Sequence, residues 1–121
     1  MRLLLDNSSN DTIVWMPENG EWFEFGQKLG VLAGLEALLK KKNVKLADVS
    51  GLAVVVGRGR FTSTRIAATV ANTLAYALQI PIVAVNDSRE KWLDKLSVQP
   101  VGQYISAQYS AEANIGKKFI E

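Results

Sequence analysis

The sequence contains no cysteine and no histidine. Without cysteine the chain cannot form disulfides, thiolate zinc sites or a cysteine nucleophile, and without histidine it has no imidazole general base. The first apolar run ends at Asp6 after only three leucines, which is far too short for a signal or membrane segment. We therefore expect a cytoplasmic protein that has no membrane partner.

Neither sign of charge dominates, because 14 Lys and Arg residues stand against 12 Asp and Glu residues, for a net charge of +2. This excess is too small to predict binding to nucleic acid or to an anionic membrane by bulk electrostatics. The chain has 121 residues, of which 48% are hydrophobic, and this is enough for one globular domain with a modest core.

The hydrophobic pattern predicts strands and helices without an internal repeat. Residues 51–56 are wholly apolar, which is typical of a central strand covered on both faces. Residues 17–20 contain an Asn-Gly pair that suits a hairpin turn, and Asn43 can end the first long helix. We expect strands at residues 3–5, 12–16, 21–25, 51–56 and 81–85, and helices at residues 29–42, 62–78 and 88–96, the last capped by Asp87 or Ser88.

Three strands in a meander, followed by helix, strand, helix and strand, are the layout of the ribonuclease H-like half of actin-type ATPases. We therefore predict an α/β fold with a mixed five-stranded sheet and flanking helices. The domain should span residues 1–96, and residues 97–121 should form an extension without a clear pattern.

The second long helix has two faces of different character. We expect its larger apolar residues, from Ile66 to Leu78, to face the sheet, while several alanines keep the helix slim. The outward face would carry an uncharged strip, formed by Thr69, Asn72, Thr73 and Tyr76. A surface that lacks charge and contains a tyrosine is typical of the core of an interface, although ordinary solvated side chains would give the same pattern.

The segment that joins residues 51–56 to this helix reads Gly-Arg-Gly-Arg-Phe-Thr-Ser-Thr-Arg-Ile. Its two glycines permit a sharp turn, and Thr62 opens a helix whose free N–H groups point back at the turn, as in anion or partner sites. Arg58 and Arg60, with Arg65 nearby, would form a cationic pocket for a phosphate or for a partner's carboxylate. The simpler alternative is that these arginines are solvated surface residues.

This segment resembles the Gly-Pro-Gly-Ser-Phe-Thr-Gly-x-Arg-Ile-Gly motif of the TsaB family, the non-catalytic partner subunit in bacterial synthesis of threonylcarbamoyladenosine on tRNA. Residues 3–8, 72–82 and 108–115 are similar to further segments of that family. The second actin-like domain of full-length members has no counterpart, so we expect a compact, single-domain version. The chain also lacks the histidine that members usually carry near residues 26–28, and the family's Pro, Ser and two Gly are replaced by Arg58, Arg60, Ser63 and Ala67.

The resemblance implies a non-enzymatic assembly subunit that binds the catalytic threonylcarbamoyl transferase subunit as a heterodimer. The pathway ATPase would be a further partner, and tRNA would be contacted only through the complex. Alone, the chain should form a homodimer, because family members pair through the two long helices of this half. No cofactor is implied. The expected contact residues are Leu32, Leu35, Leu39, Arg58, Arg60, Phe61, Thr62, Arg65, Thr69, Asn72, Thr73 and Tyr76.

Asp6, at the end of the first strand, could instead hold Mg²⁺, as in nucleases and ATPases of this fold. A two-metal nuclease needs further carboxylates near that strand end, and Asp87 is the only other well-placed candidate. An aspartate that leads into Asn-Ser-Ser more often caps a turn, and an actin-type ATPase needs a second domain. The alternatives are a ribonuclease H-like nucleic-acid-binding protein or nuclease that uses Asp6 and Asp87, and a self-associating module without a pathway role.

Overall fold

The computed structural model describes residues 1–9, 11–56, 61–87 and 91–106. These residues form a five-stranded sheet with the strand order β3-β2-β1-β4-β5. Its strands are β1 (Arg2–Asp6), β2 (Thr12–Pro17), β3 (Phe23–Gly26), β4 (Gly51–Val55) and β5 (Ile82–Val85). The helices are α1 (Val31–Lys42), α2 (Phe61–Leu78) and α3 (Trp92–Ser97), and two 3₁₀ turns, η1 (Gln27–Leu29) and η2 (Leu46–Asp48), precede α1 and β4.

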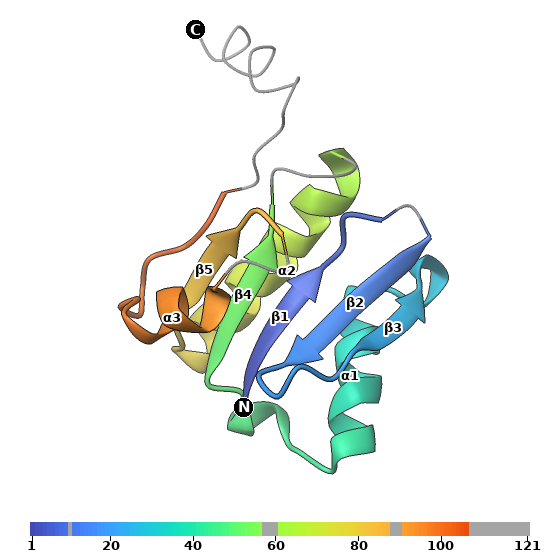
Figure 1. The fold of residues 1–121 in the computed structure, drawn as a ribbon, viewed down its shortest axis with the longest axis horizontal. Helices are drawn as coiled ribbons and strands as arrows, with labels where there is room; N and C mark the ends of the chain where they lie inside the picture. Colours follow the sequence, from blue (N-terminus) through green and yellow to red (C-terminus); the bar gives the residue numbers. More distant parts are fainter. Residues whose placement is uncertain (10, 57–60, 88–90, 107–121) are drawn as a thin grey trace, which may run out of the picture.

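The sheet is mixed, as predicted. β1 pairs antiparallel with β2 and parallel with β4, so that Leu5 lies between Trp15 and Val54, and β5 continues the parallel part. Helices α1 and α2 cover one face of the sheet, and the short α3 covers the other face over β4 and β5 (Figure 1). No helix in the described part of the chain is long and apolar enough to cross a membrane.

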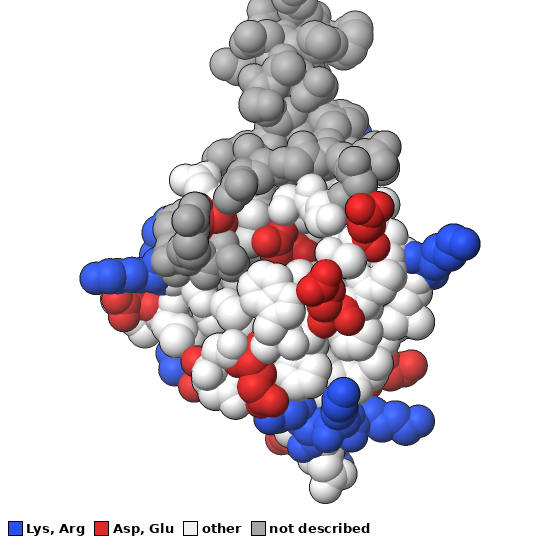
Figure 2. Space-filling view, turned by 45° about the vertical axis from the view of Figure 1, so that its right-hand side comes forward, with Lys and Arg blue, Asp and Glu red and all other residues white. Residues whose placement is uncertain are grey.

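Charged side chains are spread over the surface without a dominant sign. Figure 2, which brings the β2–β3 side of the molecule forward, shows separate acidic side chains on a largely uncharged face. Basic side chains gather at the lower end, where α1 stops in Figure 1. The last turn of α1 contains Lys40, Lys41 and Lys42, and cations at this end complement the helix dipole.

The two faces of the sheet bury alternate residues of the central strands. Leu3 and Leu5 pack towards α1 and α2, whereas Leu4 packs towards α3. In β4, Leu52 and Val54 likewise face α1 and α2, whereas Ala53 and Val55 face the other way. Burial on both faces explains why these strands are continuously apolar and confirms the central position predicted for residues 51–56.

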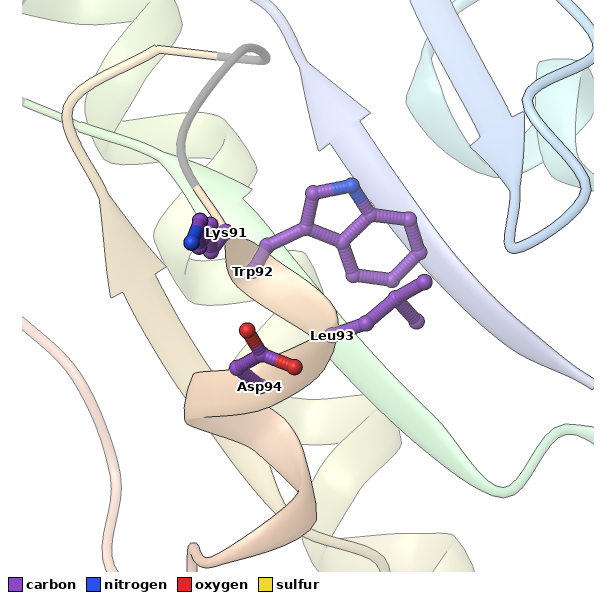
Figure 3. Close-up of a pocket in the computed structure, with 4 residues that line it drawn as sticks. All are labelled: Lys91, Trp92, Leu93 and Asp94. Carbon is purple, nitrogen blue, oxygen red and sulfur yellow. The ribbon is translucent and has the colours of Figure 1, made fainter.

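Trp92 is the main side chain that α3 contributes to its face. In Figure 3, Trp92 and Leu93 extend to the same side, across β4 towards β1, whereas Asp94 points away. Trp92 is buried with Leu4 in the second core cluster. A shallow hollow of about 280 Å³ beside it is lined by Lys91, Trp92, Leu93 and Asp94. The helix begins at Trp92, with Lys91 at its N-cap, which is later than the predicted start at residue 88. Asp87 is therefore not the N-cap of α3, and Ser88 lies outside the described residues.

Helix α2 turns its alanines, rather than its largest apolar residues, towards the sheet. Ala67, Ala71 and Ala75 are fully buried, whereas Ile66 is 48% exposed. The prediction that Ile66 faces the sheet is therefore wrong. Residues four apart lie on one face of a helix, and the alanine row lets the helix axis come close to the strands. The helix begins at Phe61, one residue before the expected Thr62.

The first long helix begins at Val31, two residues later than predicted. Gly30 separates it from η1 and has φ 91° and ψ 157°, a conformation that only glycine adopts readily. The end of the helix was predicted correctly, because Asn43 is left-handed with φ 55°. The buried indole Nε1 of Trp15 donates to the backbone carbonyl of Val31 at 3.1 Å, which fixes the start of the helix on β2.

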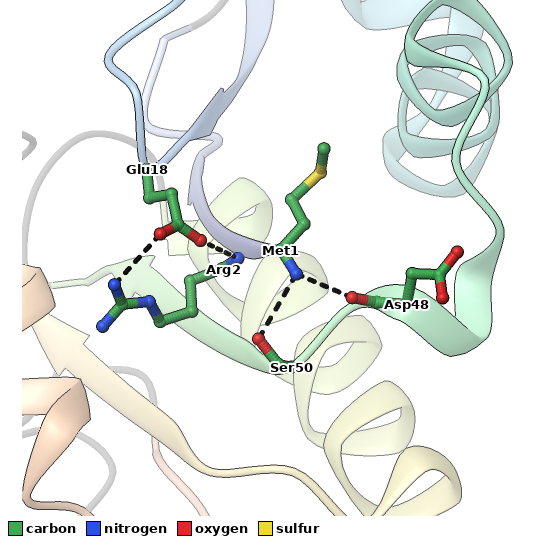
Figure 4. Close-up of polar contacts among 5 residues, drawn as sticks. All are labelled: Met1, Arg2, Glu18, Asp48 and Ser50. Atoms are coloured by element: carbon green, nitrogen blue, oxygen red, sulfur yellow. Dashed lines mark hydrogen bonds and ion pairs between the residues drawn. The ribbon is translucent and has the colours of Figure 1, made fainter.

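Polar contacts hold the start of β1 against its neighbours (Figure 4). The amino group of Met1 donates to the backbone carbonyl of Asp48 at 2.7 Å. The backbone N–H of Arg2 donates to Glu18 Oε1 at 2.9 Å, and its guanidinium donates to Oε2 at 3.0 Å. The hydrogen bonds from the Arg2 side chain, and then from its backbone, hold the pKa of Glu18 below its ordinary value near 4.5. Glu18 thereby ties the β2–β3 hairpin turn to β1.

We expect Gly30→Ala to destabilise the fold by about 1–3 kcal/mol, because a Cβ at this φ is strained although nothing lies within 4 Å of it. Gly26→Ala is the matched control. Gly26 also has open space for a Cβ but has φ −69°, and its replacement should change stability by less than about 1 kcal/mol. Urea unfolding of the two variants measures the difference, and equal effects would contradict this explanation.

The lowered pKa of Glu18 predicts an acid-sensitive contribution to stability. The folded state holds the carboxylate charged, so the contribution is complete above the ordinary carboxyl value and is lost as the pH falls through the folded-state pKa. Glu18→Gln should therefore lower the melting temperature at neutral pH, and the difference from wild type should shrink between about pH 6 and about pH 3. Because the pair is on the surface, the effect should stay below about 1 kcal/mol. A difference independent of pH would contradict the assignment.

Candidate partner interface

The carboxyl ends of β1 and β4 meet at one edge of the sheet, where α2 begins. This edge is the expected position of the glycine–arginine turn, but Arg58 and Arg60 lie outside the described residues. The backbones of Phe61 and Thr62 form the start of α2, while their side chains also lie outside the description. The proposed cationic pocket therefore stays a prediction.

A polar side chain that sequence reasoning did not single out organises this edge. Asn7 directly follows β1 and is only 2% exposed. Its Nδ2 donates to the backbone carbonyl of Ser63 in the first turn of α2 at 3.0 Å. Its Oδ1 accepts from Gln27 Nε2 at 2.7 Å, and the same Nε2 donates to the carbonyls of Ser9 and Thr12 at 2.9 and 3.1 Å. Asn7 and Gln27 thus join β1, β2, η1 and α2.

Two sequence signals pointed near this network without predicting it. Asn7 lies in residues 3–8, which resemble a segment of the TsaB family, and Gln27 lies where members usually carry a histidine. An amide placed directly after a buried parallel strand is the signal that could have identified Asn7, because a polar group at a buried strand end needs partners.

Asp6 serves the turn that follows β1. Its Oδ1 accepts hydrogen bonds from the Ser8 backbone N–H at 3.0 Å and from the Ser8 hydroxyl at 2.6 Å. Within the described residues, no group of three or more His, Cys, Asp or Glu side chains could hold a metal ion. The geometry therefore favours turn capping by Asp6 over the magnesium site that was the alternative.

The three leucines expected at the interface lie on different sides of α1. Leu32 is 56% exposed, while Leu35 and Leu39 are buried in the core against the sheet. The expectation that Leu35 and Leu39 contact a partner is wrong, because both side chains are buried and expose almost no surface that another molecule could contact. Leu32 remains, in one row with the exposed Glu36 and Lys40.

The outer face of α2 carries no charged residue from Ile66 to Leu78, so the uncharged surface extends one turn beyond the predicted strip. Thr69, Thr73 and Tyr76 are exposed as expected, and Tyr76 is 66% exposed. Ile66 adds an exposed aliphatic side chain about one turn before Thr69. The neighbouring Arg65 is also exposed. The Thr73 hydroxyl donates to the backbone carbonyl of Thr69 at 2.8 Å, so this polar group is already satisfied within the helix.

Asn72 differs from the rest of the predicted strip because it is half-buried. A segment after α3, residues 103–106, lies against it, and we call this segment the strap. Asn72 Nδ2 donates to the backbone carbonyl of Ile105 at 2.8 Å, and the Ile105 N–H donates to Asn72 Oδ1 at 3.0 Å. The rings of Tyr76 and Tyr104 lie 6.4 Å apart at 56°. Sequence reasoning missed this contact because the hydrophobic residues of the strap do not recur with the spacing of a helix or a strand.

We expect Asn7→Ala to destabilise the protein by about 1–3 kcal/mol, because it removes a buried side chain and both of its hydrogen bonds, to Gln27 and to the carbonyl of Ser63. Asn19→Ala is a matched control, since Asn19 also makes two hydrogen bonds through its side chain but lies on the exposed hairpin turn. Its loss should change stability by about 0.5 kcal/mol or less. Thermal unfolding of both variants tests the comparison, and an Asn7 variant as stable as the control would show that the network does not hold this edge.

Comparison with known proteins relates this architecture to tRNA modification. A family model described as TsaD, tRNA N6-adenosine threonylcarbamoyltransferase, matches residues 30–110. The tRNA N6-adenosine threonylcarbamoyltransferase of Wigglesworthia glossinidia brevipalpis is 42% identical over 52 residues, which are 43% of this chain and 15% of that protein.

Two solved structures from Pseudomonas aeruginosa have the same fold. YeaZ is 33% identical with a TM-score of 0.59, over 71% of this chain and 44% of that one. A protein described as similar to the peptidase YeaZ is 32% identical with a TM-score of 0.58, over 71% and 43% of the two chains. The chain thus spans less than half the length of these solved relatives.

The match to the family model covers well over half of the chain, and the likeness to YeaZ (TsaB) agrees with the motif found in residues 57–66. The fold is accordingly the ribonuclease H-like fold of actin-like ATPases, and the chain belongs to the TsaD and TsaB family of tRNA threonylcarbamoyladenosine modification.

Proposed function

We propose that the chain is a non-catalytic assembly subunit of threonylcarbamoyladenosine modification, which binds the catalytic transferase subunit through the outer faces of α1 and α2. The observation that carries the proposal is the uncharged surface of α2, with Ile66 and Tyr76 about half or more exposed in a chain that has ample charge elsewhere. Aromatic and aliphatic side chains without charge are typical of the buried core of an interface.

The polar groups at the carboxyl edge support a binding role rather than a catalytic one. Asp6 is engaged by Ser8, and Asn7 is engaged by Gln27 and Ser63, so each already has an internal partner. These contacts account for both side chains as structural groups, and among the described residues no group of three or more carboxylates surrounds Asp6. In this proposal the transferase subunit supplies the chemistry, and this chain positions it.

The same surface would determine the other partners. Without the transferase subunit, we expect two copies to pair through α1 and α2, since an uncharged patch that is left exposed favours self-association. The pathway ATPase would join the complex as a further partner, and tRNA would be contacted only through the assembled complex. Arg65, exposed at the start of α2, is the described residue through which an acidic partner group would be attracted.

The test is association measured with purified protein, by sedimentation equilibrium for the chain alone and by titration with the transferase subunit of the same organism. Ile66→Glu and Tyr76→Glu should each weaken association about tenfold or more, ~1.4 kcal/mol, because a charge would be buried in an uncharged contact. Trp22→Glu is the matched control, since Trp22 is also large and exposed but lies on the β2–β3 hairpin. It should leave association unchanged.

Three results would count against the proposal. The first is a chain that remains monomeric at high concentration and also fails to bind the transferase subunit. The second is equal behaviour of all three variants, and the third is an activity of the chain itself. Magnesium-dependent cleavage of RNA by the purified chain, abolished by Asp6→Ala, would support the nuclease alternative instead.

A further inference from the structure

The strap lies on the same strip of α2 that the proposed function assigns to a partner. Asn72 is hydrogen-bonded to Ile105, and Tyr76 contacts the ring of Tyr104. A hollow of about 300 Å³ between them is lined by Asn72, Thr73, Tyr76 and Tyr104. Three of the four residues of the predicted strip therefore border the chain's own C-terminal segment.

Asn72 holds the strap by its backbone. A side-chain amide has one donor group and one acceptor oxygen, and Asn72 uses them for the carbonyl and the N–H of a single residue, as a neighbouring β-strand would. While Ile105 is bound, its backbone stands between the Asn72 amide and any partner that approaches this turn. A partner that covers this turn of α2 must therefore first displace the strap.

The strap is held by few contacts. Tyr76 stays 66% exposed and Tyr104 45% exposed although their rings meet, so little surface is buried between them. Ile105 packs on the edge of the main core, but a hollow of about 320 Å³ remains between the strap, α3 and β5. Among the described residues the strap forms no ladder with β5, which is the edge strand of the sheet. Such a segment can leave α2 without unfolding the sheet.

We propose that the strap is an intramolecular gate, which competes with a second copy of the chain for the outer face of α2. The proposal rests on the proposed function, because it takes α2 as the association surface. When binding requires an open state, the apparent dissociation constant equals the intrinsic one divided by the open fraction. Both copies of a symmetric dimer must release their straps, so if each strap is docked about nine-tenths of the time, release of both tightens self-association about a hundredfold.

The variant Ile105→Pro tests the gate without altering α2. Proline lacks the N–H that Asn72 Oδ1 accepts and the aliphatic side chain that packs on the core. Ile105→Val is the matched control, since it keeps both backbone hydrogen bonds and most of the packing. In sedimentation equilibrium, Ile105→Pro should lower the dimer dissociation constant by up to about a hundredfold, because both copies carry the open strap, and Ile105→Val should leave it unchanged.

A second measurement, amide hydrogen exchange, reports whether the strap is bound to α2. The Ile105 amide hydrogen should exchange slowly in wild type and quickly in Asn72→Ala, because this variant removes its acceptor. Asn72→Ala should also tighten self-association, although it changes α2 and the strap together. Melting curves of each variant confirm that the fold is retained.

The outcomes separate the gate from the function on which it rests. If Ile105→Pro associates as wild type does, the strap does not gate the surface. If it associates more weakly, the strap is part of the interface, and the gate is again excluded while the interface stands. If wild type and all released variants remain monomeric, α2 is not an association surface for a second copy, and both proposals on self-association fail.

Discussion

β1 and β4 pair in parallel from Arg2 beside Gly51 to Leu5 beside Val54, and this pairing determines where everything else in the molecule can lie. Parallel strands need a crossover, which here consists of the β2–β3 hairpin, η1, α1 and η2. The crossover places α1 next to α2 on one face, because β4 continues into α2 on that same face. It also brings both strand ends to one edge, where Asn7 can reach the first turn of α2.

The sequence predicted those parts of the fold that depend on neighbours along the chain. Residues 3–5 and 51–56 are apolar because both of their faces are buried, and Asn43 ends α1 in the left-handed conformation. The predicted hairpin turn is present, with Gly20 at φ 88° and its N–H bonded to the carbonyl of Pro17. The face of α2 was assigned wrongly because hydrophobicity ranks Ile66 above alanine, whereas close approach to a sheet selects small side chains.

The candidate site was less accessible to sequence reasoning because its contacts join distant residues. Asn7 meets Ser63, and Asn72 meets Ile105, through side-chain amides that in the sequence are indistinguishable from ordinary turn and surface residues. Leu35 and Leu39 were expected to contact a partner, yet the side of a helix that faces a sheet depends on where the sheet lies. The uncharged strip of α2 was predictable because a lack of charge is visible in the sequence itself.

Core packing and surface chemistry are linked through α2. A helix that buries Ala67, Ala71 and Ala75 against the sheet can carry its larger side chains only on its flanks and outer face, which leaves Ile66 and Tyr76 exposed in the single chain. The strap contacts Asn72 and Tyr76, whereas Ile66 and Thr69, earlier in the helix, are exposed. The outer face around Ile66 and Thr69 is thus exposed while the strap is docked. A second copy that covers the whole outer face must therefore displace the strap from the turns around Asn72 and Tyr76, whereas Ile66 and Thr69 are exposed in either state of the strap.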